Sequence, residues 1–362
     1  MNVFVAIMLI FAAAGFVDKA LGGRWGLTES FDRGLGVMPT MVIPVMSICS
    51  VGSEFIRRHT DAIAGLKDGL FFDPSTIIGA ILPPDFGGYF IVREITDSPY
   101  LLVFNGVILG TLLGQAISFQ LPVFMAATDR EDHPHIFKGF IVAIAIVPVG
   151  MLVGALCIRM PFGLFLRQFL PVLILCLIIA AGLYAAPKKT AMIFAGFARL
   201  INWLMYALFA MAVIGIFLPS LAYASTDSVL EALMIVFKCA VVASGALVMS
   251  ELILKIFRRQ IQRISARMGI NEVSAVSLLM TCATSLAILP LYPRMDPKGK
   301  QIVAAFSLSG AYVFGGSMAF VSNVTDGFTV GVFVLVKFLC GILSAFIIHL
   351  LYKREQGTRS MY

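Results

Sequence analysis

One carboxylate in this sequence stands where the chain must break its helix. Asp85 lies among apolar residues in the segment 81–88, which reads I-L-P-P-D-F-G-G. The two prolines end a helix, and Gly87 and Gly88 permit backbone conformations that other residues adopt only at a cost. A carboxylate held in such a break could neutralise a small cation. Alternatively, Asp85 caps a half-helix that begins near Phe86, and the two roles are compatible.

Amides and hydroxyls add further polar groups within apolar stretches. Asn105 and Gln115 lie in one stretch, and Ser317 follows Gly316 in another. Such side chains hydrogen-bond the hydroxyl or amine of a ligand, or they hydrogen-bond one another across helices. We therefore predict a substrate-binding site whose members are Asp85, Asn105, Gln115, Ser317, Gly87, Gly88 and Gly316.

Two lysines, Lys238 and Lys337, also interrupt apolar stretches. A charged side chain in hydrocarbon is costly, so such a residue has two ordinary arrangements. It extends its ammonium group to the membrane surface, or it pairs with a buried carboxylate. We expect one of these two arrangements for each lysine.

The sequence contains no motif that carries enzyme chemistry. It lacks G-x-S-x-G, H-E-x-x-H, a Walker loop and a G-x-G-x-x-G between a strand and a helix. The six cysteines stand apart and are typical of small buried hydrophobes, while His133 and His135 lie in a polar stretch that we interpret as a solvated loop. We therefore expect no catalysis, no metal site, no cofactor and no ATP-driven pump.

The composition places these residues in a membrane. Of 362 residues, 59% are hydrophobic and 13% are charged, whereas a soluble domain has about 25% charged residues. The mean hydropathy is +0.95. The net charge of +7 comes from basic residues between apolar segments, which favours contact with a lipid bilayer over nucleic acid. The chain is therefore predicted to be an all-α polytopic membrane protein, and a soluble enzyme, a disordered chain and an outer-membrane barrel are excluded.

Eleven apolar segments divide the chain, and we predict about 9–11 membrane segments. They are 2–17, 37–56, 75–92, 100–127, 136–158, 164–186, 192–222, 229–256, 273–292, 300–323 and 328–352. The first is expected to be a retained helix, because no basic region or clear cleavage site marks a signal peptide. Segments 75–92 and 273–292 are interrupted by proline or glycine, and such backbone persists only where it is buried in protein or lines a wet cavity.

Basic residues favour one side of the membrane. The loop 257–272 and the tail 353–362 are rich in Lys and Arg, and the stretch after 273–292 is basic as well. The positive-inside rule therefore predicts a cytoplasmic C-terminus. Both ends of 273–292 then lie on one side, as a re-entrant hairpin or as a pair of half-helices.

The two halves of the chain share a weak internal similarity. A Ser-Glu pair at 53–54 recurs at 250–251, and Arg93 matches Arg294 at a separation of 201 residues. We predict an inverted repeat, a plan that places a transporter's site at the repeat interface. Its parts are a first repeat 1–160, a linker helix 161–190, a second repeat 191–352 and a cytoplasmic tail 353–362. The plan places the basic residues of 57–67 outside, which is contrary to the charge rule.

Several stretches match a known family in order over nearly the whole chain. They are P-D-F-G-G-Y-F at 84–90 followed by Arg93-Glu94, N-G-V-I-L-G at 105–110, M-D-P-K-G-K at 295–300, F-S-L-S-G-A at 306–311, and Phe320. These stretches resemble C-D-M-G-G-F-F…K-E-L, S-G-L-I-L-G, M-D-T-R-G-K and F-A-V-S-A-A…F of the ethanolamine-utilisation permease family, the EutH type. The resemblance implies uptake or facilitated passage of ethanolamine across a bacterial inner membrane, alongside a cobalamin-dependent ammonia-lyase pathway.

The chain also departs from that family. Ala287-Ile288 stand near its Asn-Asn pair, and Gly316 and Ser317 replace an Asp and a His. A different small amino alcohol or polar solute is therefore an alternative substrate.

Together these features predict a multi-pass transporter or facilitator of a small amine, with ethanolamine as the first candidate. Asp85 would attract the ammonium group, Asn105, Gln115 and Ser317 would bond the hydroxyl or line the path, and the glycines would let the backbone approach the ligand. The alternatives from other classes are a membrane-embedded enzyme and a non-transporting membrane subunit. The expected partners are the amine and the lipid bilayer, and a homo-oligomer is left open.

Overall fold

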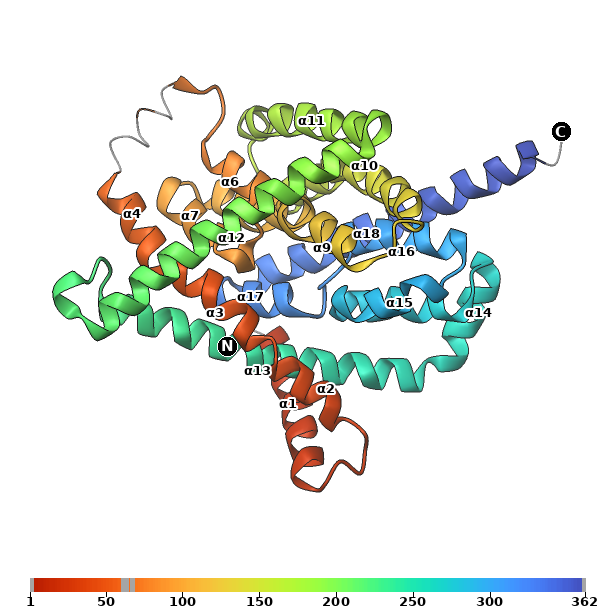
Figure 1. Ribbon diagram of the computed structural model, residues 1–362, viewed down its shortest axis with the longest axis horizontal. Coiled ribbons are helices and arrows are strands. Elements are labelled where there is room, and N and C mark those ends of the chain that lie inside the picture. Colours follow the sequence, from red (N-terminus) through yellow and green to blue (C-terminus); the bar gives the residue numbers. More distant parts are fainter. Residues whose placement is uncertain (1–2, 60–64, 66–68, 360–362) are drawn as a thin grey trace.

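The computed structural model of the chain is built from helices, packed into one bundle (Figure 1). It describes all residues except 1–2, 60–64, 66–68 and 360–362. No strand occurs in this part of the chain. The predicted all-α polytopic class is thereby confirmed.

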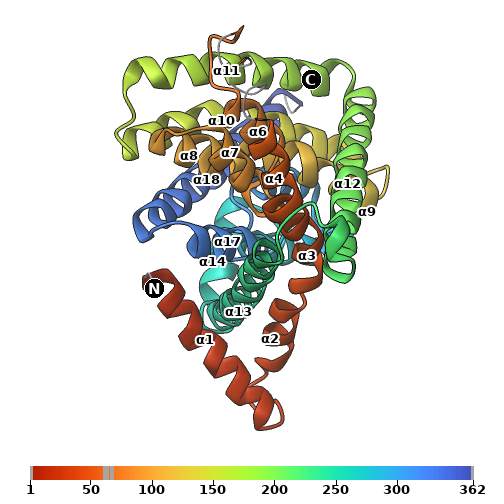
Figure 2. The same cartoon turned by 90° about the vertical axis from the view of Figure 1, so that its left-hand side faces the viewer.

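Eight helices within the described residues are long and apolar enough to cross a membrane. Six are α1 (Val3–Ala20), α10 (His133–Cys157), α11 (Phe162–Ala185), α12 (Pro187–Phe217), α13 (Thr226–Ile256) and α18 (Gly327–Arg359). One composite helix comprises α2 (Thr28–Leu35), α3 (Met38–Met46), η1 (Ser47–Gly52) and α4 (Ser53–Arg58). The other comprises α8 (Pro99–Val103), η3 (Phe104–Gly114), η4 (Ala116–Gln120) and α9 (Leu121–Ala127). Figure 2 shows α11 crossing one side of the bundle, while α1 and α2 project from the opposite side.

The interrupted segment 75–92 forms a helical hairpin. It consists of α6 (Ser75–Ile81), η2 (Pro84–Phe86) and α7 (Gly88–Ile95). Pro83 and the left-handed Gly87, with a φ of 88°, turn the chain between the two arms. Asn105, near the start of the helix α8–α9, donates to Ser75 at 2.8 Å, and α7 ends just before α8 begins. Both ends of this first hairpin therefore lie at the same end of the bundle.

The interrupted segment 273–292 forms a second hairpin, of α15 (Glu272–Ala283) and η6 (Leu286–Arg294). The side chain of Asn271 donates to the carbonyl of Arg294 at 2.9 Å, so the two ends of the hairpin lie together. Lys300, which follows this hairpin, pairs at 2.5 Å with Asp132, which follows α9. The second hairpin therefore enters the bundle from the end opposite to the first. The inverted repeat itself stays a prediction.

The segment 300–323, which we predict to be an ordinary span, is broken as well. α16 (Pro297–Ser309) and α17 (Gly316–Val324) are separated by six non-helical residues. Within this break, the backbone N–H groups of Tyr312 and Phe314 donate to the carbonyls of Thr281 and Cys282 at 3.2 and 2.8 Å. The end of α15 thus supplies the acceptors that a continuous helix would have supplied itself.

Ala311, Gly315 and Ala319 follow the four-residue spacing that is typical of a helix-packing face, but because of the break they do not share one helix. The backbone at Gly315 instead touches α15, where a Cβ atom would lie 1.8 Å from the carbonyl oxygen of Ala283. Gly315 therefore packs against α15, a separate helix, and not against a partner of its own helix.

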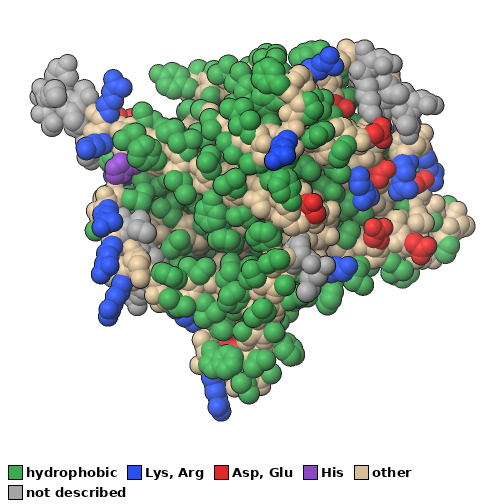
Figure 3. Space-filling view, turned by 180° about the vertical axis from the view of Figure 1, so that it is seen from behind, with side chains coloured by type: hydrophobic (Ala, Val, Ile, Leu, Met, Phe, Trp, Pro, Cys, Tyr) green, Lys and Arg blue, Asp and Glu red, His purple; other side chains and the backbone are tan. Residues whose placement is uncertain are grey.

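Charged side chains gather toward two ends of the molecule, with a mainly hydrophobic area between them (Figure 3). At one end, Lys298 donates to the carbonyl of Met268, at the end of α14 (Arg258–Met268), and lies 5.8 Å from the ring of Tyr352. The basic segments before α15, before α16 and at the end of α18 thus lie together. Their cytoplasmic location stays a prediction. Lys67 and residues 360–362 lie outside the described residues.

The opposite end also carries basic groups. Arg58 donates to the carbonyl of Tyr223 at 2.9 Å, in the loop that contains η5 (Pro219–Leu221) and precedes α13. Arg58 also pairs with Glu54 at 2.8 Å, so part of its charge is balanced locally.

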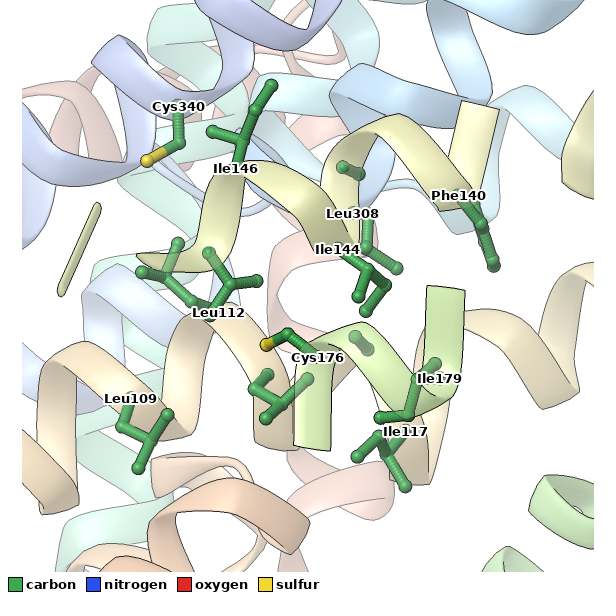
Figure 4. Close-up of a cluster of buried hydrophobic side chains, with 14 of the residues drawn as sticks. Leu109, Leu112, Ile117, Phe140, Ile144, Ile146, Cys176, Ile179, Leu308 and Cys340 are labelled. Carbon is green, nitrogen blue, oxygen red and sulfur yellow. The ribbon is translucent and has the colours of Figure 1, made fainter. Parts of the chain in front are cut away.

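Apolar packing holds the hairpins in the bundle. Figure 4 shows side chains from η3, η4, α10, α11, α16 and α18 that meet in one cluster, including Leu112, Ile144 and Ile179. Van der Waals contact of this kind, more than hydrophobic burial, drives helix association in lipid. Gly114, at the end of η3, lets the first hairpin pack closely against this helix, because a Cβ atom at Gly114 would lie 2.6 Å from the carbonyl oxygen of Leu82.

The substitution Gly114→Ala is expected to destabilise the protein, because the added methyl group would meet the backbone of α6. Overpacking of this kind costs on the order of 1–3 kcal/mol. Thermal unfolding in detergent measures the loss. Gly331→Ala is the matched control, since a Cβ atom there meets nothing within 4 Å. Equal unfolding midpoints for the two variants would contradict the proposed close approach.

Candidate functional site

The tips of the two hairpins meet at a cavity of about 330 Å³. The cavity is within the range of small-molecule sites, which measure roughly 300–1,000 Å³. Its polar lining near the tips comes from Asp85, Gln115, Thr284 and Tyr312. Its lining also includes the exposed Arg33 on α2, so the cavity reaches the surface.

Asp85 occupies the tip of the first hairpin. Its Oδ2 atom accepts a hydrogen bond of 2.9 Å from the hydroxyl of Ser317, at the start of α17. Its Oδ1 atom is buried and has no hydrogen-bond partner among the described residues. The residue at the N-cap of α7 is Gly87, and no side chain caps this helix, so the capping role predicted as an alternative is wrong. A buried carboxylate oxygen without a donor is costly, and a cationic ligand would remove that cost.

A chain of hydrogen bonds connects Asp85 to a buried lysine. Ser317 accepts from the amide nitrogen of Gln115 at 3.4 Å, and the amide oxygen of Gln115 accepts from Lys337 at 2.8 Å. Lys337 also donates to the carbonyl of Thr111 at 3.2 Å and is fully buried. It therefore does not reach the membrane surface. Two neutral side chains separate its ammonium group from the carboxylate.

The second hairpin contributes a separate polar group. The hydroxyl of Ser285 donates to Gln120 at 3.0 Å and shares a hydrogen bond of 2.8 Å with the hydroxyl of Tyr312. Gln120 in turn donates to the carbonyl of Ser307 at 3.0 Å. These contacts fix the tip of the second hairpin to the helices α8–α9 and α16, and they hold the Tyr312 hydroxyl beside the cavity.

Aromatic side chains pack together between α7 and α17, next to the tip of the first hairpin. The ring of Phe320 on α17 lies 5.7 Å from Phe90 and 6.4 Å from Tyr89, both on α7. The Tyr89 hydroxyl donates to the carbonyl of Val324 at 3.2 Å. The cavity lining at the other side includes Leu254, near the end of α13 that leads to α14. The cavity lining therefore extends toward this end of the bundle.

The structure brings four of the predicted site residues together. Asp85, Gln115 and Gly316 line the cavity. Ser317 is not part of the lining but donates a hydrogen bond to Asp85. A Cβ atom at Gly316 would meet only Val37, at 3.9 Å, so this glycine leaves the cavity wide.

The other three predicted residues lie outside the cavity lining. Asn105 is fully buried and donates to Ser75 and Thr76, at the start of α6, so it holds the base of the first hairpin. Gly87 and Gly88 shape the tip. A Cβ atom at Gly87 would lie 2.4 Å from the side chain of Ile48 on η1.

Sequence reasoning omits Lys337 and Tyr312 from the site. A signal existed for Lys337, because a lysine within an apolar stretch is expected to pair with a buried carboxylate. None existed for Tyr312, since a continuous helix over 300–323 would not place it at a break. Within the described part of the chain, no three metal-binding side chains converge.

Comparison with known proteins gives a consistent set of similarities. The family model described as "Ethanolamine utilisation protein, EutH" matches residues 1–351. The chain is 29% identical over 322 residues to the uncharacterized protein YxeR of Bacillus subtilis, covering 88% of this chain and 86% of that protein. It is 25% identical over 332 residues to the probable ethanolamine permease EutH of Listeria monocytogenes, covering 90% and 87%. The corresponding probable permease of Escherichia coli is 22% identical over 395 residues, covering 99% and 97%. No solved structure matches the chain significantly.

The substitution Ser317→Ala is expected to lower stability, because Asp85 loses the donor to its Oδ2 atom. A hydrogen bond to a charged group contributes about 1.5–3 kcal/mol. Thermal unfolding in detergent measures the difference. Ser344→Ala is the matched control, because Ser344 is equally buried but bonds only the carbonyl of Gly341 in its own helix. An equal loss in both variants would argue against the link to Asp85.

Proposed function

Because the chain belongs to the EutH family of ethanolamine utilisation proteins, we propose that it transports ethanolamine, or a closely related small amino alcohol, across a bacterial inner membrane. Relatives named probable ethanolamine permeases from three bacteria support this proposal. The eight apolar helices and the cavity at the tips of the two hairpins support it as well.

The observation that carries the proposal is the unpartnered Oδ1 atom of Asp85 at the cavity. An alkylammonium group placed against it supplies both a donor and a compensating positive charge. Such a hydrogen bond between charged groups is roughly twice as strong as one between neutral groups. A neutral solute of the same shape supplies no charge, so the site selects for amines.

The rest of the cavity suits a short chain with a hydroxyl end. The hydroxyl groups of Tyr312 and Thr284 and the amide of Gln115 line the same space as Asp85 and can bond the substrate hydroxyl. Phe86 and other apolar residues face the space between them, where the methylene groups of the substrate lie. The open position at Gly316 admits a slightly larger amino alcohol as well.

One-sided access fits a carrier that opens to each side in turn. We infer that the contact of Phe320 with Tyr89 and Phe90 closes the path from the cavity to one end of the bundle. We infer that α7 and α17 move apart when the cavity opens to that end, because these two helices carry the closing side chains.

The variant Asp85→Asn tests the proposal directly. Counterflow of labelled ethanolamine into liposomes, corrected with protein-free liposomes, is expected to fall about 10- to 150-fold, which corresponds to the loss of about 1.5–3 kcal/mol of binding. Asp85→Glu keeps the charge and is expected to retain part of the activity. Asp227→Asn, an exposed aspartate at the start of α13, is the control and should behave as the wild type. Full activity of Asp85→Asn would remove Asp85 from the site, and absence of counterflow in every protein would favour an enzyme or a non-transporting subunit.

Competition by analogues tests the selectivity. Ethylene glycol, which lacks the charge, is expected not to inhibit counterflow at a hundredfold excess over ethanolamine. Ethylammonium, which lacks the hydroxyl, is expected to inhibit with weaker affinity than unlabelled ethanolamine. Inhibition by ethylene glycol as strong as that by ethylammonium would contradict a site built on a carboxylate.

A further inference from the structure

The buried surroundings of Lys337 contain no other charged side chain. The segments that surround the lysine are η3, α17, residues 139–156 of α10 and residues 301–309 of α16, and these contain no charged residue. The other titratable groups nearby are Cys340, one turn along α18, Cys239 on α13, and Tyr312, whose hydroxyl binds Ser285. Arg33 and Glu251 line the cavity with Asp85, but Arg33 is exposed and Glu251 pairs with Lys255 at 3.5 Å. The lysine ammonium is therefore the buried cation that balances the Asp85 carboxylate when no ligand is bound.

The hydrogen-bond chain makes this balance specific. Lys337 donates to Gln115, Gln115 to Ser317, and Ser317 to the Oδ2 atom of Asp85. The chain orients three donor groups toward the carboxylate but leaves its Oδ1 atom free of a donor. The lysine thus compensates the charge from a distance while the position beside the carboxylate stays available.

A bound ammonium changes the charge balance. The interior would then contain two cations, the substrate and Lys337, against one carboxylate. An uncompensated ion in a protein interior costs several kcal/mol even after relaxation. Loss of one proton from Lys337 removes this cost, because the neutral amine keeps an N–H group for its hydrogen bond to Gln115.

We propose that Lys337 gives up a proton when the substrate ammonium binds Asp85, so that the protein exchanges one ammonium for one proton. This inference rests on the proposed function. In the step, one N–H bond of the lysine ammonium breaks, its electron pair stays on Nζ, and the proton passes to water. When the substrate leaves, Nζ takes a proton from water on that side. Each cycle then moves no net charge across the membrane.

Proton release by the purified protein tests the exchange without any transport. In a weakly buffered detergent solution at pH 7, where ethanolamine is almost entirely protonated, a pH indicator should report about one proton released for each ethanolamine bound. By linkage, the apparent affinity should weaken about tenfold for each unit that the pH is lowered. Binding without proton release by the wild type would overturn the inference.

The variant Lys337→Arg keeps a cation beside Gln115, but a guanidinium does not lose its proton in a protein, so this variant should bind ethanolamine more weakly, without releasing a proton and without this pH dependence. If it does not fold, infrared difference spectra of the wild type keep the test, because loss of a protonated-carboxyl band on binding would show that the proton comes from Asp85 and would overturn the inference. Lys238→Met is the matched control, because Lys238 also interrupts an apolar stretch but is exposed, and it should release a proton as the wild type does.

Liposome measurements separate the failure of this inference from the failure of the proposed function. Absence of ethanolamine counterflow in the wild type would overturn the proposed function itself. Wild-type uptake driven by membrane potential would leave that function in place but overturn proton exchange. Uptake driven by a pH gradient in the wild type and by membrane potential in Lys337→Arg would support the exchange. Uptake driven equally by a pH gradient in both would indicate passage of the neutral amine and would overturn it.

Discussion

The structure depends on one constraint: a polar group inside the membrane must find its partner within the protein. Three of the membrane segments are not continuous helices, so their backbone groups need acceptors and donors from elsewhere. The break between α16 and α17 is satisfied by the end of α15, and the carbonyl of Ile81 at the end of α6 accepts from the hydroxyl of Ser118 on η4. Each broken element is therefore stable only in the presence of its neighbour.

Close approach of the backbones allows one segment to supply hydrogen-bond partners to another. Gly315 lies against the carbonyl of Ala283, and Gly114 lies against that of Leu82. In lipid, where no hydrophobic driving force brings helices together, such contact supplies much of the attraction between them. The glycines therefore allow the hairpin tips to pack closely against their neighbours, and Gly315 also lines the cavity.

The same constraint explains the chemistry of the site. The side chains of Gln115 and Ser317 satisfy each other and also the two charges, so the cost of burying Lys337 is spread over a connected network. The Oδ1 atom of Asp85 is left without a donor beside the cavity. In the proposed function, an ammonium ligand supplies that donor, so a structural requirement of the buried carboxylate becomes the basis of selectivity for a cation.

The sequence by itself determined the class of protein and the position of its principal carboxylate. Composition and apolar segment length identify membrane helices because hydrocarbon excludes charge locally, residue by residue. Prolines and glycines within 75–92 and 273–292 likewise marked the two hairpins, and Asp85 stood out as a charge within such a break.

Tertiary structure alone decided the break within 300–323, the removal of Asn105 from the cavity lining, and the connection of Lys337 to Asp85. Residues 85 and 317 are 232 positions apart, and a sequence window cannot contain both. Whether they meet depends on how whole helices pack, because the partner of a buried polar group comes from another segment when its own helix cannot provide one.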